Sequence, residues 1–327
     1  MADAENKNPS FEVEDLAIPF SIGQDAWASY KEHRPEYPQS MFDLWFDYHR
    51  KHGGKFDAAH DVGAGGGILS ATLARHFARV AVSDPGSSNL ALARSVLHPA
   101  SQFTFHLSPG EEPWLPPSSV DLVACGESLH WMDTEPALAA AAASLKPGGT
   151  FAAVFYGLGM YFPQDHPRLT HLMRDAQLDA YRMFFADSPG LQHERVRSAP
   201  RRCMRGFNSL ALPDEATGAF RDWTRVNINL HGREDIDAFR ALPEEEFPVE
   251  EGRVKDSEKV INVEDETWGR EVDVDWVKGF LVSLTMPYDQ RCWDLPSWVE
   301  FERIINQEFG GKVKAEWPVS VLLGSKK

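Results

Sequence analysis

Between residues 56 and 156, short apolar runs alternate with stretches of helical periodicity, and this alternation limits the chain to few folds. In the first helical stretch, 68–77, Leu69, Leu73 and Phe77 recur every four residues, as one helix face requires. A second helix is expected over Pro136–Leu145, capped by Asp133 or Thr134. This order predicts a parallel, doubly wound sheet. Its expected strands are Ala58–Val62, Val80–Ser83, Phe103–His106, Val120–Cys125 and Thr150–Tyr156.

A run of glycines, Asp61-Val-Gly-Ala-Gly-Gly-Gly67, lies where the first strand ends and the first helix begins. Glycines there allow a tight turn and a close approach to a ligand, which the helix N-terminal amides face. The dinucleotide fingerprint needs glycine at its first, third and sixth positions, whereas this chain has Ile68 at the sixth. The spacing therefore opposes NAD or FAD and favours a nucleoside without phosphates.

Asp84 closes the second expected strand. A carboxylate at that place can accept hydrogen bonds from ribose hydroxyls. Alternatively, Asp84-Pro85-Gly86 is only a turn, because all three residue types favour turns. Together with the glycine run, the ribose interpretation is favoured.

The rest of the chain is less regular. Residues 1–20 are polar and expected to be poorly ordered, and the acidic stretch 244–251 is most simply a solvated loop. Further helices are expected over Met41–Tyr48 and Asp275–Leu284. A final strand over Val313–Gly324 is expected to return to the sheet.

Charge and composition exclude several classes of protein. Asp and Glu number 49 against 33 Lys and Arg, and the net charge of −16 opposes binding to nucleic acid. No apolar run reaches the ~18 residues of a membrane span, and the N-terminus lacks a signal-peptide pattern. Cys125, Cys203 and Cys292 form no metal-ligand cluster. We expect a cytoplasmic protein without metal or membrane partners.

Three motifs resemble class I S-adenosylmethionine-dependent methyltransferases: the glycine run, the strand-ending Asp84, and Lys146-Pro-Gly-Gly-Thr150. Two more, Tyr30…Arg34-Pro-Glu-Tyr-Pro38 and Glu127-Ser-Leu-His-Trp-Met-Asp133, resemble the trans-aconitate methyltransferase group, especially its fungal members. The resemblance implies a Rossmann-like α/β fold with a seven-stranded, mostly parallel sheet and an inserted cap. It divides the chain into a tail and lid (1–50), a cofactor-binding core (51–156), a cap and substrate region with later core elements (157–300), and a C-terminal helix and strand (301–327).

The same resemblance implies a cofactor site for S-adenosyl-L-methionine. The first trans-aconitate motif, with Tyr30 and Arg34, folds over the cofactor. Glu127 is expected to contact the cofactor's amino group or the substrate and is, with His130, a candidate catalytic residue. Alternatively, it only caps the end of its strand. The remaining positions are Asp61, Gly63, Ala64 and Gly65 for the methionine part, Asp84 for the ribose, Ser108, Gly110 and Glu111 for the adenine, and Pro85 as a further cofactor contact.

For the substrate side, we expect a pocket wall of aromatic and imidazole side chains, although such residues also form ordinary core. His130 is a possible general base, but packing is the favoured interpretation because no catalytic partner is evident. Arg182, Arg225 and His231 are possible carboxylate anchors. The expected wall is Trp27, His130, Trp131, Tyr156, Trp276 and Phe280.

The resulting hypothesis is a methyltransferase that acts on a carboxylate oxygen of a small acid or secondary metabolite. Two alternatives remain open. One is a hydroxyl or amine methyltransferase, and the other is a protein of the same fold that binds the cofactor but catalyses a pericyclic or isomerisation step. A non-catalytic partner protein is disfavoured by the intact glycine run and Asp84.

Overall fold

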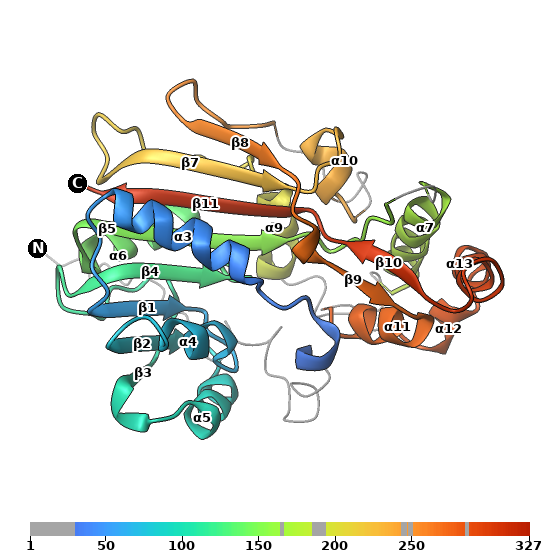
Figure 1. Ribbon diagram of the computed structural model, residues 1–327, viewed down its shortest axis with the longest axis horizontal. Helices are drawn as coiled ribbons and strands as arrows, with labels where there is room; N and C mark the ends of the chain where they lie inside the picture. The colour runs from blue at the N-terminus through green and yellow to red at the C-terminus, as the bar shows by residue number, and fades with distance from the viewer. Residues whose placement is uncertain (1–29, 164–166, 185–193, 243–246, 248–250, 285–287) are drawn as a thin grey trace, which may run out of the picture.

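The computed structural model describes residues 30–163, 167–184, 194–242, 247, 251–284 and 288–327. Its main sheet has eight strands in the order β3-β2-β1-β4-β5-β11-β7-β8 (Figure 1). Only β11 runs against the other strands of this sheet. The strands are β1 Ala58–Val62, β2 Arg79–Asp84, β3 Phe103–Leu107, β4 Val120–Gly126, β5 Leu145–Tyr156, β6 Met204–Phe207, β7 Phe220–Ile228, β8 Lys259–Val263, β9 Gly269–Val272, β10 Val313–Glu316 and β11 Val319–Lys326.

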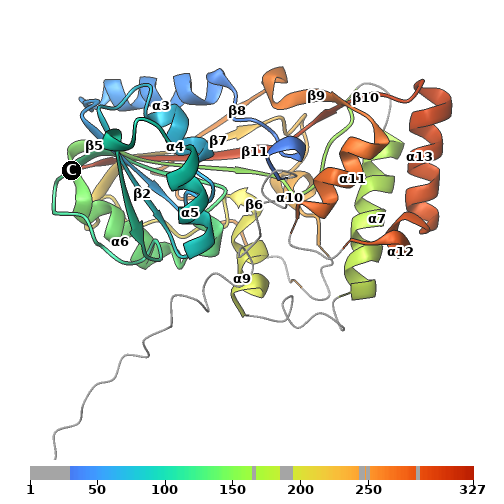
Figure 2. The ribbon, with the colours of Figure 1, turned by 90° about the horizontal axis from the view of Figure 1, so that it is seen from below.

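Helices cover both faces of this sheet. In β4, Leu122 and Ala124 pack under α3, α4 and α5, whereas Val123 and Cys125 pack under α6, as the alternation of side chains along a strand requires. Figure 2 shows α3 on one side of the sheet and α6 and α9 on the other. The helices are α3 Gln39–Lys51, α4 Ile68–Leu73, α5 Ser87–Val96, α6 Thr134–Ser144, α7 Pro167–Phe184, α9 Glu194–Cys203, α10 Asp235–Phe239, α11 Val274–Val282, α12 Gln290–Trp293 and α13 Pro296–Glu308, with short 3-10 turns η1 Ala100–Gln102, η2 Leu129–Trp131 and η3 Glu266–Trp268.

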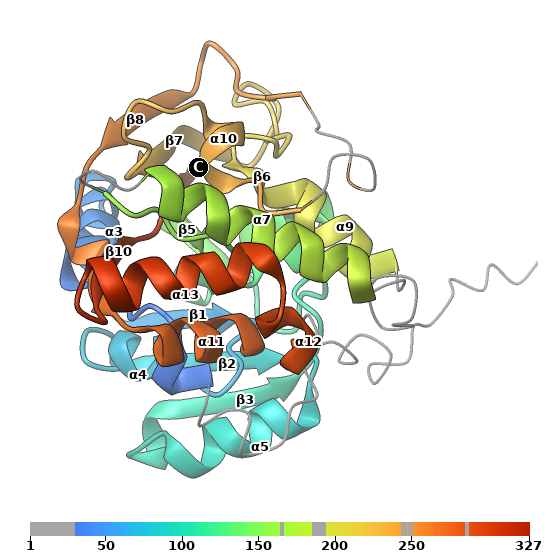
Figure 3. The ribbon, with the colours of Figure 1, turned by 90° about the vertical axis from the view of Figure 1, so that its right-hand side faces the viewer.

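A helical cap, formed by α7, α11, α12 and α13, lies beyond the carboxyl ends of β1, β4 and β5 (Figures 1 and 3). Within it, α13 packs along α7. Beside the cap, β9 and β10 pair into a separate two-stranded sheet. None of the helices in the described ranges is long and apolar enough to cross a membrane. The four-part division of the chain stays a prediction.

The parallel, doubly wound sheet expected from the sequence is confirmed, with one strand more than the seven expected. The expected return of the C-terminal strand to the sheet is confirmed by β11, which pairs with β5 and β7. Its extent as one strand over Val313–Gly324 is wrong, because the chain breaks at Trp317-Pro318 and the first part, β10, pairs with β9 instead. Proline has no N–H to donate to a ladder, so neither strand includes Pro318.

Two local expectations also need correction. The helix after the glycine run ends at Leu73 instead of Phe77, although Leu69, Leu73 and Phe77 are all buried as expected. Asp133 occupies the N-cap position of α6 but makes no side-chain capping bond, because its carboxylate accepts a hydrogen bond from Arg202 instead.

Candidate functional site

The glycine loop, residues 61–67, joins β1 to α4 at the carboxyl end of the sheet. Gly63 and Gly65 have φ of 69° and 54°, a left-handed conformation that favours glycine. The N–H groups of Gly63 and Ala64 donate to the Ser83 carbonyl at 2.9 and 3.0 Å. A Cβ on Gly63 would lie 2.5 Å from the Cβ of Ser128, so a larger residue would displace the chain after β4.

Asp84, the last residue of β2, holds the glycine loop through its carboxylate. Oδ2 accepts the N–H of Gly65 at 2.8 Å, and Oδ1 accepts the N–H of Gly86 at 2.7 Å and the side-chain amide of Asn89 at 2.9 Å. Burial raises the pKa of Asp84, and these hydrogen bonds oppose the rise. A carboxylate has about four acceptor positions, so Oδ2 retains one for a ligand hydroxyl. The turn and ribose interpretations are thus compatible, and ribose binding stays a prediction.

Asp61 adds a second buried carboxyl group beside the glycine loop. Its Oδ2 accepts a hydrogen bond from Ser70 Oγ of α4 at 2.6 Å. Burial raises the pKa of Asp61 to about 7; the Ser70 hydrogen bond opposes the rise, and the nearby Asp84 carboxyl adds to it. Two carboxyl groups with these restrained positions suit a ligand that carries amino and hydroxyl donors.

Ser108 follows β3 and lies next to the chain that continues from β2 into Pro85. Its N–H donates to the Asp84 carbonyl at 3.3 Å. Its Oγ is buried and has no hydrogen-bond partner within the described residues. A buried hydroxyl left without a partner is unusual in proteins and fits a ligand at this place. These features make the predicted residues a suitable site for a nucleoside cofactor.

Gly110 and Glu111 connect this region to the chain after β4. A Cβ on Gly110 would lie 2.5 Å from the Sδ of Met132, so only glycine fits without a shift. Glu111 Oε1 accepts the backbone N–H of Asp133 at 3.0 Å. Their predicted contact with adenine stays a prediction, but both residues border the predicted cofactor region.

Glu127 follows β4 in a strained conformation, with φ of 54°. Its Oε1 accepts the N–H of Tyr156 at 2.6 Å. Burial raises the pKa of Glu127 to about 8, although the Tyr156 hydrogen bond and the charge of Arg34 lower it. The next residue, Ser128, donates from Oγ to the Val62 carbonyl at 2.6 Å. This part of the chain is therefore fixed to both β5 and β1.

His130 is buried in η2 and packs against aromatic rings. Its ring centroid lies 5.0 Å from that of Phe155 and 5.4 Å from that of Trp131. Burial lowers the pKa of His130 to about 3, and the positive charges of Arg202 and Arg34 lower it further. Its Nδ1 has no hydrogen-bond partner in the described part of the chain. A neutral, ring-packed imidazole agrees with the packing interpretation, and a catalytic role stays a prediction.

The tyrosine cluster consists of Tyr30, Arg34, Tyr37, Glu127 and Tyr156. The Arg34 guanidinium lies 4.6 Å from the ring centroid of Tyr30, and its Nη1 donates to the Tyr156 hydroxyl at 3.4 Å. Burial and neighbouring groups raise the pKa of Tyr37 and Tyr156 well above the usual range, so both phenols stay protonated. Residues distant in sequence therefore meet here around one cation.

Helix α11 lies behind Arg34. Nε and Nη2 of Arg34 donate to the hydroxyl and the carbonyl of Ser283 at 2.8 and 2.9 Å. The Phe280 ring centroid is 5.6 Å from the guanidinium, and Trp276 stacks on Phe280 at 5.9 Å. Trp276 Nε1 also donates to the Glu32 carbonyl at 3.2 Å, which fastens the predicted lid segment to the helical cap.

One member of the predicted wall, Trp131, lies elsewhere. Trp131 packs against Ala180, Phe184 and Cys292 of the helical cap. Trp27 lies outside the described residues. Tyr156, Trp276 and Phe280 do come together around Arg34, which agrees with the expected wall, but contact with a substrate stays a prediction.

Arg225 does not serve as a carboxylate anchor, whereas that role stays a prediction for Arg182. Arg225 is fully buried in β7, where its Nε donates to Glu258 at 2.5 Å and its other nitrogens donate to two backbone carbonyls. This is a matched internal ion pair. Arg182 lies half-exposed on α7, beside Asp179 at 3.4 Å. The expectation for Arg225 is wrong, and Arg182 faces solvent.

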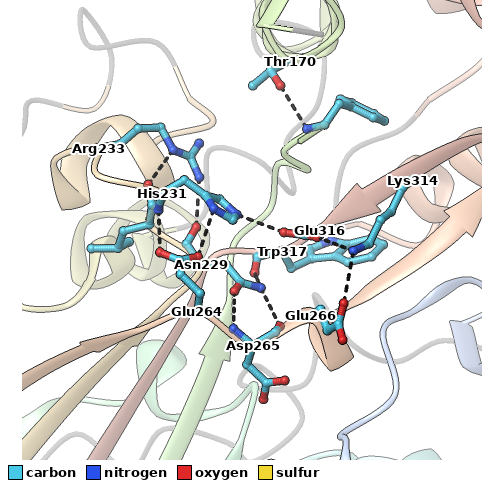
Figure 4. A network of polar contacts seen from close by, with 12 residues as sticks. Thr170, Asn229, His231, Arg233, Glu264, Asp265, Glu266, Lys314, Glu316 and Trp317 are labelled. Atoms are coloured by element: carbon cyan, nitrogen blue, oxygen red, sulfur yellow. Dashed lines mark hydrogen bonds and ion pairs between the residues drawn. The ribbon is translucent and has the colours of Figure 1, made fainter. Parts of the chain in front are cut away.

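His231 is likewise wrong as an anchor, because it belongs to a polar network at the ends of β7, β8 and β10 (Figure 4). Its Nε2 lies 2.9 Å from Glu316 Oε2 and its Nδ1 lies 3.0 Å from Glu264 Oε2. Asn229 donates from the same network to the Asp265 carbonyl at 3.0 Å. Acids contact both ring nitrogens of His231, so it cannot receive a carboxylate as well.

Sequence reasoning missed three residues of this site. Tyr37 packs edge-on to Trp268 at 6.4 Å and approaches Gly126, where a Cβ would lie 2.8 Å from its hydroxyl. Its place in the Arg34–Pro38 motif was the available signal. Ser283 and Arg202 had none, because each acts through contacts with residues far away in the sequence. No cluster of three or more metal-ligand side chains occurs in the described ranges.

Comparisons with known proteins find similarity to methyltransferases. Residues 60–153 match a family described as a methyltransferase domain. Methyltransferase AacuQ from Aspergillus aculeatus is 30% identical, over 94% of this chain and 95% of its own. Methyltransferase ptaI from Pestalotiopsis fici is 30% identical, over 93% and 94%. A solved type II methyltransferase structure from Anaeromyxobacter dehalogenans is 23% identical, over 89% of this chain and 97% of that one, with a TM-score of 0.48.

The parallel sheet, its one reversed strand and the glycine loop define a Rossmann-like class I methyltransferase. The chain belongs to the methyltransferase family of these fungal relatives, and S-adenosylmethionine is its cofactor.

Proposed function

We propose that this enzyme transfers the methyl group of S-adenosylmethionine to a carboxylate oxygen of a small acid or secondary metabolite. The observation that carries the proposal is the state of Glu127. Its Oε1 accepts the N–H of Tyr156, and its pKa of about 8 leaves the side chain protonated at neutral pH. A protonated carboxyl has an O–H to donate, which a carboxylate acceptor can receive.

The charge of the tyrosine cluster supports the same class of acceptor. When Glu127 and the phenols are protonated, Arg34 is the charged member of the cluster. A cation in a partly desolvated site attracts an anion more strongly than it does in water. The likeness of residues 30–38 and 127–133 to trans-aconitate methyltransferases supports a small acid independently.

The cofactor half would hold S-adenosylmethionine through the residues already described, with Tyr30 and Arg34 covering it. When bound, the cofactor supplies a methyl group activated by its sulfonium. A carboxylate is ionised at neutral pH and needs no base. The chain's task is then to hold the two partners in line and to exclude water. The proposed holders are Asp61, Gly63, Ala64 and Gly65, then Asp84 and Pro85, and finally Ser108, Gly110 and Glu111.

A hydroxyl acceptor is the second candidate, and the same side chain favours it. Ionised Glu127, with a pKa of about 8, has a proton affinity suited to a general base near neutral pH. The two candidates differ in the active form of Glu127, which is protonated for a carboxylate and ionised for a hydroxyl. No contact in the described residues favours the amine or pericyclic alternatives.

The substitution Glu127→Gln separates the candidates, because glutamine keeps the shape and an N–H donor but cannot ionise. For a carboxylate acceptor, turnover at pH 7 should fall less than about fivefold, whereas loss of a general base costs about 10²–10⁴-fold. In the unchanged enzyme, the KM for a carboxylate should rise as pH passes the Glu127 pKa, because the O–H donor becomes a negative charge. This rise should be absent in the variant.

The assay follows labelled methyl transfer from S-adenosylmethionine to a library of small acids and phenols. A methyl ester product is cleaved by mild alkali, whereas a methyl ether is stable. Glu302→Gln, at an exposed position paired with Lys278, is the matched control. An alkali-stable product together with a large loss of turnover in Glu127→Gln would replace the carboxylate proposal with the hydroxyl one.

A further inference from the structure

We propose that Arg202 of α9 is a positioning residue that fixes the post-β4 segment, residues 127–133, and so joins the region between α7 and β7 to the cofactor half. The proposal rests on the cofactor site proposed above. Arg202 contacts neither the glycine loop nor Gly110–Glu111, the two loops expected to contact the cofactor. It acts through the post-β4 segment, which contacts both.

The post-β4 segment contacts both cofactor loops. Ser128 Oγ donates to the Val62 carbonyl at 2.6 Å. The Cβ of Ser128 occupies the space that a side chain at position 63 would need. At the other end of the segment, the N–H of Asp133 donates to Glu111 Oε1 at 3.0 Å. A shift of the segment would therefore move the glycine loop at one end and the Gly110–Glu111 region at the other.

Arg202 donates hydrogen bonds to two residues of this segment. Its Nη2 donates to Asp133 Oδ1 at 2.5 Å, and its Nη1 lies 3.3 Å from the His130 carbonyl and 3.1 Å from Ser198 Oγ. The planar guanidinium fork suits such a double contact, which a single ammonium cannot reproduce. The side chain of Asp133 therefore contacts α9 through Arg202, and its backbone N–H donates to Glu111.

The expected role is geometric because the ion pair itself contributes little stability. The Asp133 side chain is 65% exposed and that of Arg202 is 22% exposed. Pairs of this kind typically contribute about 0–1 kcal/mol, too little to hold α9 on the protein. Burial of Ala199 and Cys203 holds α9 instead, and leaves Arg202 free to set the position of the segment.

Arg205 provides a matched control in the same part of the chain. Its Nη1 donates to Asp235 Oδ1 at 2.6 Å, and the two side chains are 23% and 17% exposed. This pair fastens β6 to α10 instead of the post-β4 segment. Arg205→Gln therefore removes a similar ion pair from the same region.

The test measures the affinity of the full chain for S-adenosylhomocysteine by calorimetry, together with hydrogen exchange of residues 127–133. Arg202→Gln should weaken the affinity by about twofold to fivefold and speed this exchange, in proportion to the loss of a partly exposed charged contact. Arg202→Lys should recover part of the affinity. Arg205→Gln should change both readouts by less than about twofold.

A double-mutant cycle sharpens the test. Asp133→Asn should weaken binding less than Arg202→Gln does, because it changes only one of the two contacts that Arg202 makes with the segment. The double variant should lose no more than Arg202→Gln alone. Normal affinity in folded Arg202→Gln, or an equal loss in Arg205→Gln, would overturn the inference. Asp84→Ala distinguishes a failure of the Arg202 inference from a failure of the proposed cofactor site. If Asp84→Ala binds normally, the site is wrong, and if it alone loses affinity, only the role of Arg202 is wrong.

Discussion

The two halves of the candidate site are made from different parts of the chain. The glycine loop is built from backbone, with left-handed glycines, N–H groups directed at Ser83 and a carboxylate from the neighbouring strand. The tyrosine cluster is built from side chains that come from residues 30–37 and from the ends of β4 and β5, with α11 packed behind Arg34. One half depends on local conformation, and the other depends on the whole fold.

This difference in construction suits the different tasks of the two halves. A cofactor that is always the same is matched by backbone geometry, which few substitutions can alter without disrupting the turn. Under the proposed function, the acceptor is matched by side chains of the tyrosine cluster, which can change without disturbing β1 or β2. We therefore expect substitutions in the glycine loop to abolish binding, and substitutions in the tyrosine cluster to alter pH dependence and selectivity.

The largest effect should come from Gly63→Ala. Alanine in this left-handed conformation is strained by ~1 kcal/mol, and its Cβ would lie 2.5 Å from that of Ser128. Relief of that clash requires the glycine loop or the post-β4 segment to move. Affinity for S-adenosylhomocysteine should fall by more than about 100-fold, which corresponds to ~2.7 kcal/mol in calorimetry.

Gly53→Ala is the matched control for this prediction. Gly53 has φ of 82°, and an added Cβ would meet nothing within 4 Å. The control therefore carries the strain without the clash, and should cost at most ~1 kcal/mol of stability with unchanged cofactor affinity. Near-normal binding by Gly63→Ala would show that the loop adapts, and the contrast between the two halves would lose its basis.

The glycine loop was the half of the site that could be predicted from the sequence. The bounds of β1 match the sequence expectation, and the glycine loop lies between β1 and α4 as expected. Local signals suffice there, because alternating apolar runs define strands and glycine spacing defines a turn. The side-chain half needs long-range contacts, such as Arg34 with Ser283, that no local pattern encodes.

The later strands were missed for a related reason. β7 carries a fully buried Arg225, which interrupts the apolar pattern of a buried strand, and its partner Glu258 lies 33 residues further along the chain. A buried charge looks like a surface position until its counter-ion is located. The break at Pro318 was visible in the sequence, but the separate pairing of β10 with β9 was not.

A second prediction concerns the contribution of the tyrosine cluster to the stability of the protein. The folded state raises the Glu127 pKa to about 8, so it holds an extra proton between the usual carboxyl pKa near 4.3 and that value. The stability contribution of this group therefore falls as pH rises through that window. Glu127→Gln should be more stable than the unchanged protein at pH 8 by on the order of 1–3 kcal/mol, and equal to it near pH 4.

Urea unfolding at pH 4, 6 and 8 measures this difference. Glu302→Gln, which removes a carboxylate paired with Lys278 at the protein surface, is the matched control. An offset for Glu127→Gln that does not change with pH would mean that Glu127 ionises at its ordinary pKa. The tyrosine cluster would then contain a carboxylate beside Arg34 at neutral pH, and the argument for an anionic acceptor would fail.

The smallest effect on turnover should come from His130, which borders both halves. Burial holds its pKa at about 3, so the imidazole stays neutral between pH 5 and 9 and has little affinity for a proton. What the side chain supplies is its ring, packed on Phe155 and Trp131. His130→Ala should lower turnover by less than about tenfold without changing the shape of the pH profile.

His130→Phe is the informative companion variant, because phenylalanine restores a ring against Phe155 but cannot accept a proton. If packing is the whole contribution, His130→Phe should be closer to normal turnover than His130→Ala. If His130 is instead a general base, both variants should lose about 10²–10⁴-fold and the rising limb of the profile near pH 6–7 should vanish in both. That outcome would move the proton chemistry from Glu127 to His130 and make a hydroxyl the acceptor, since a carboxylate has no proton to give at neutral pH.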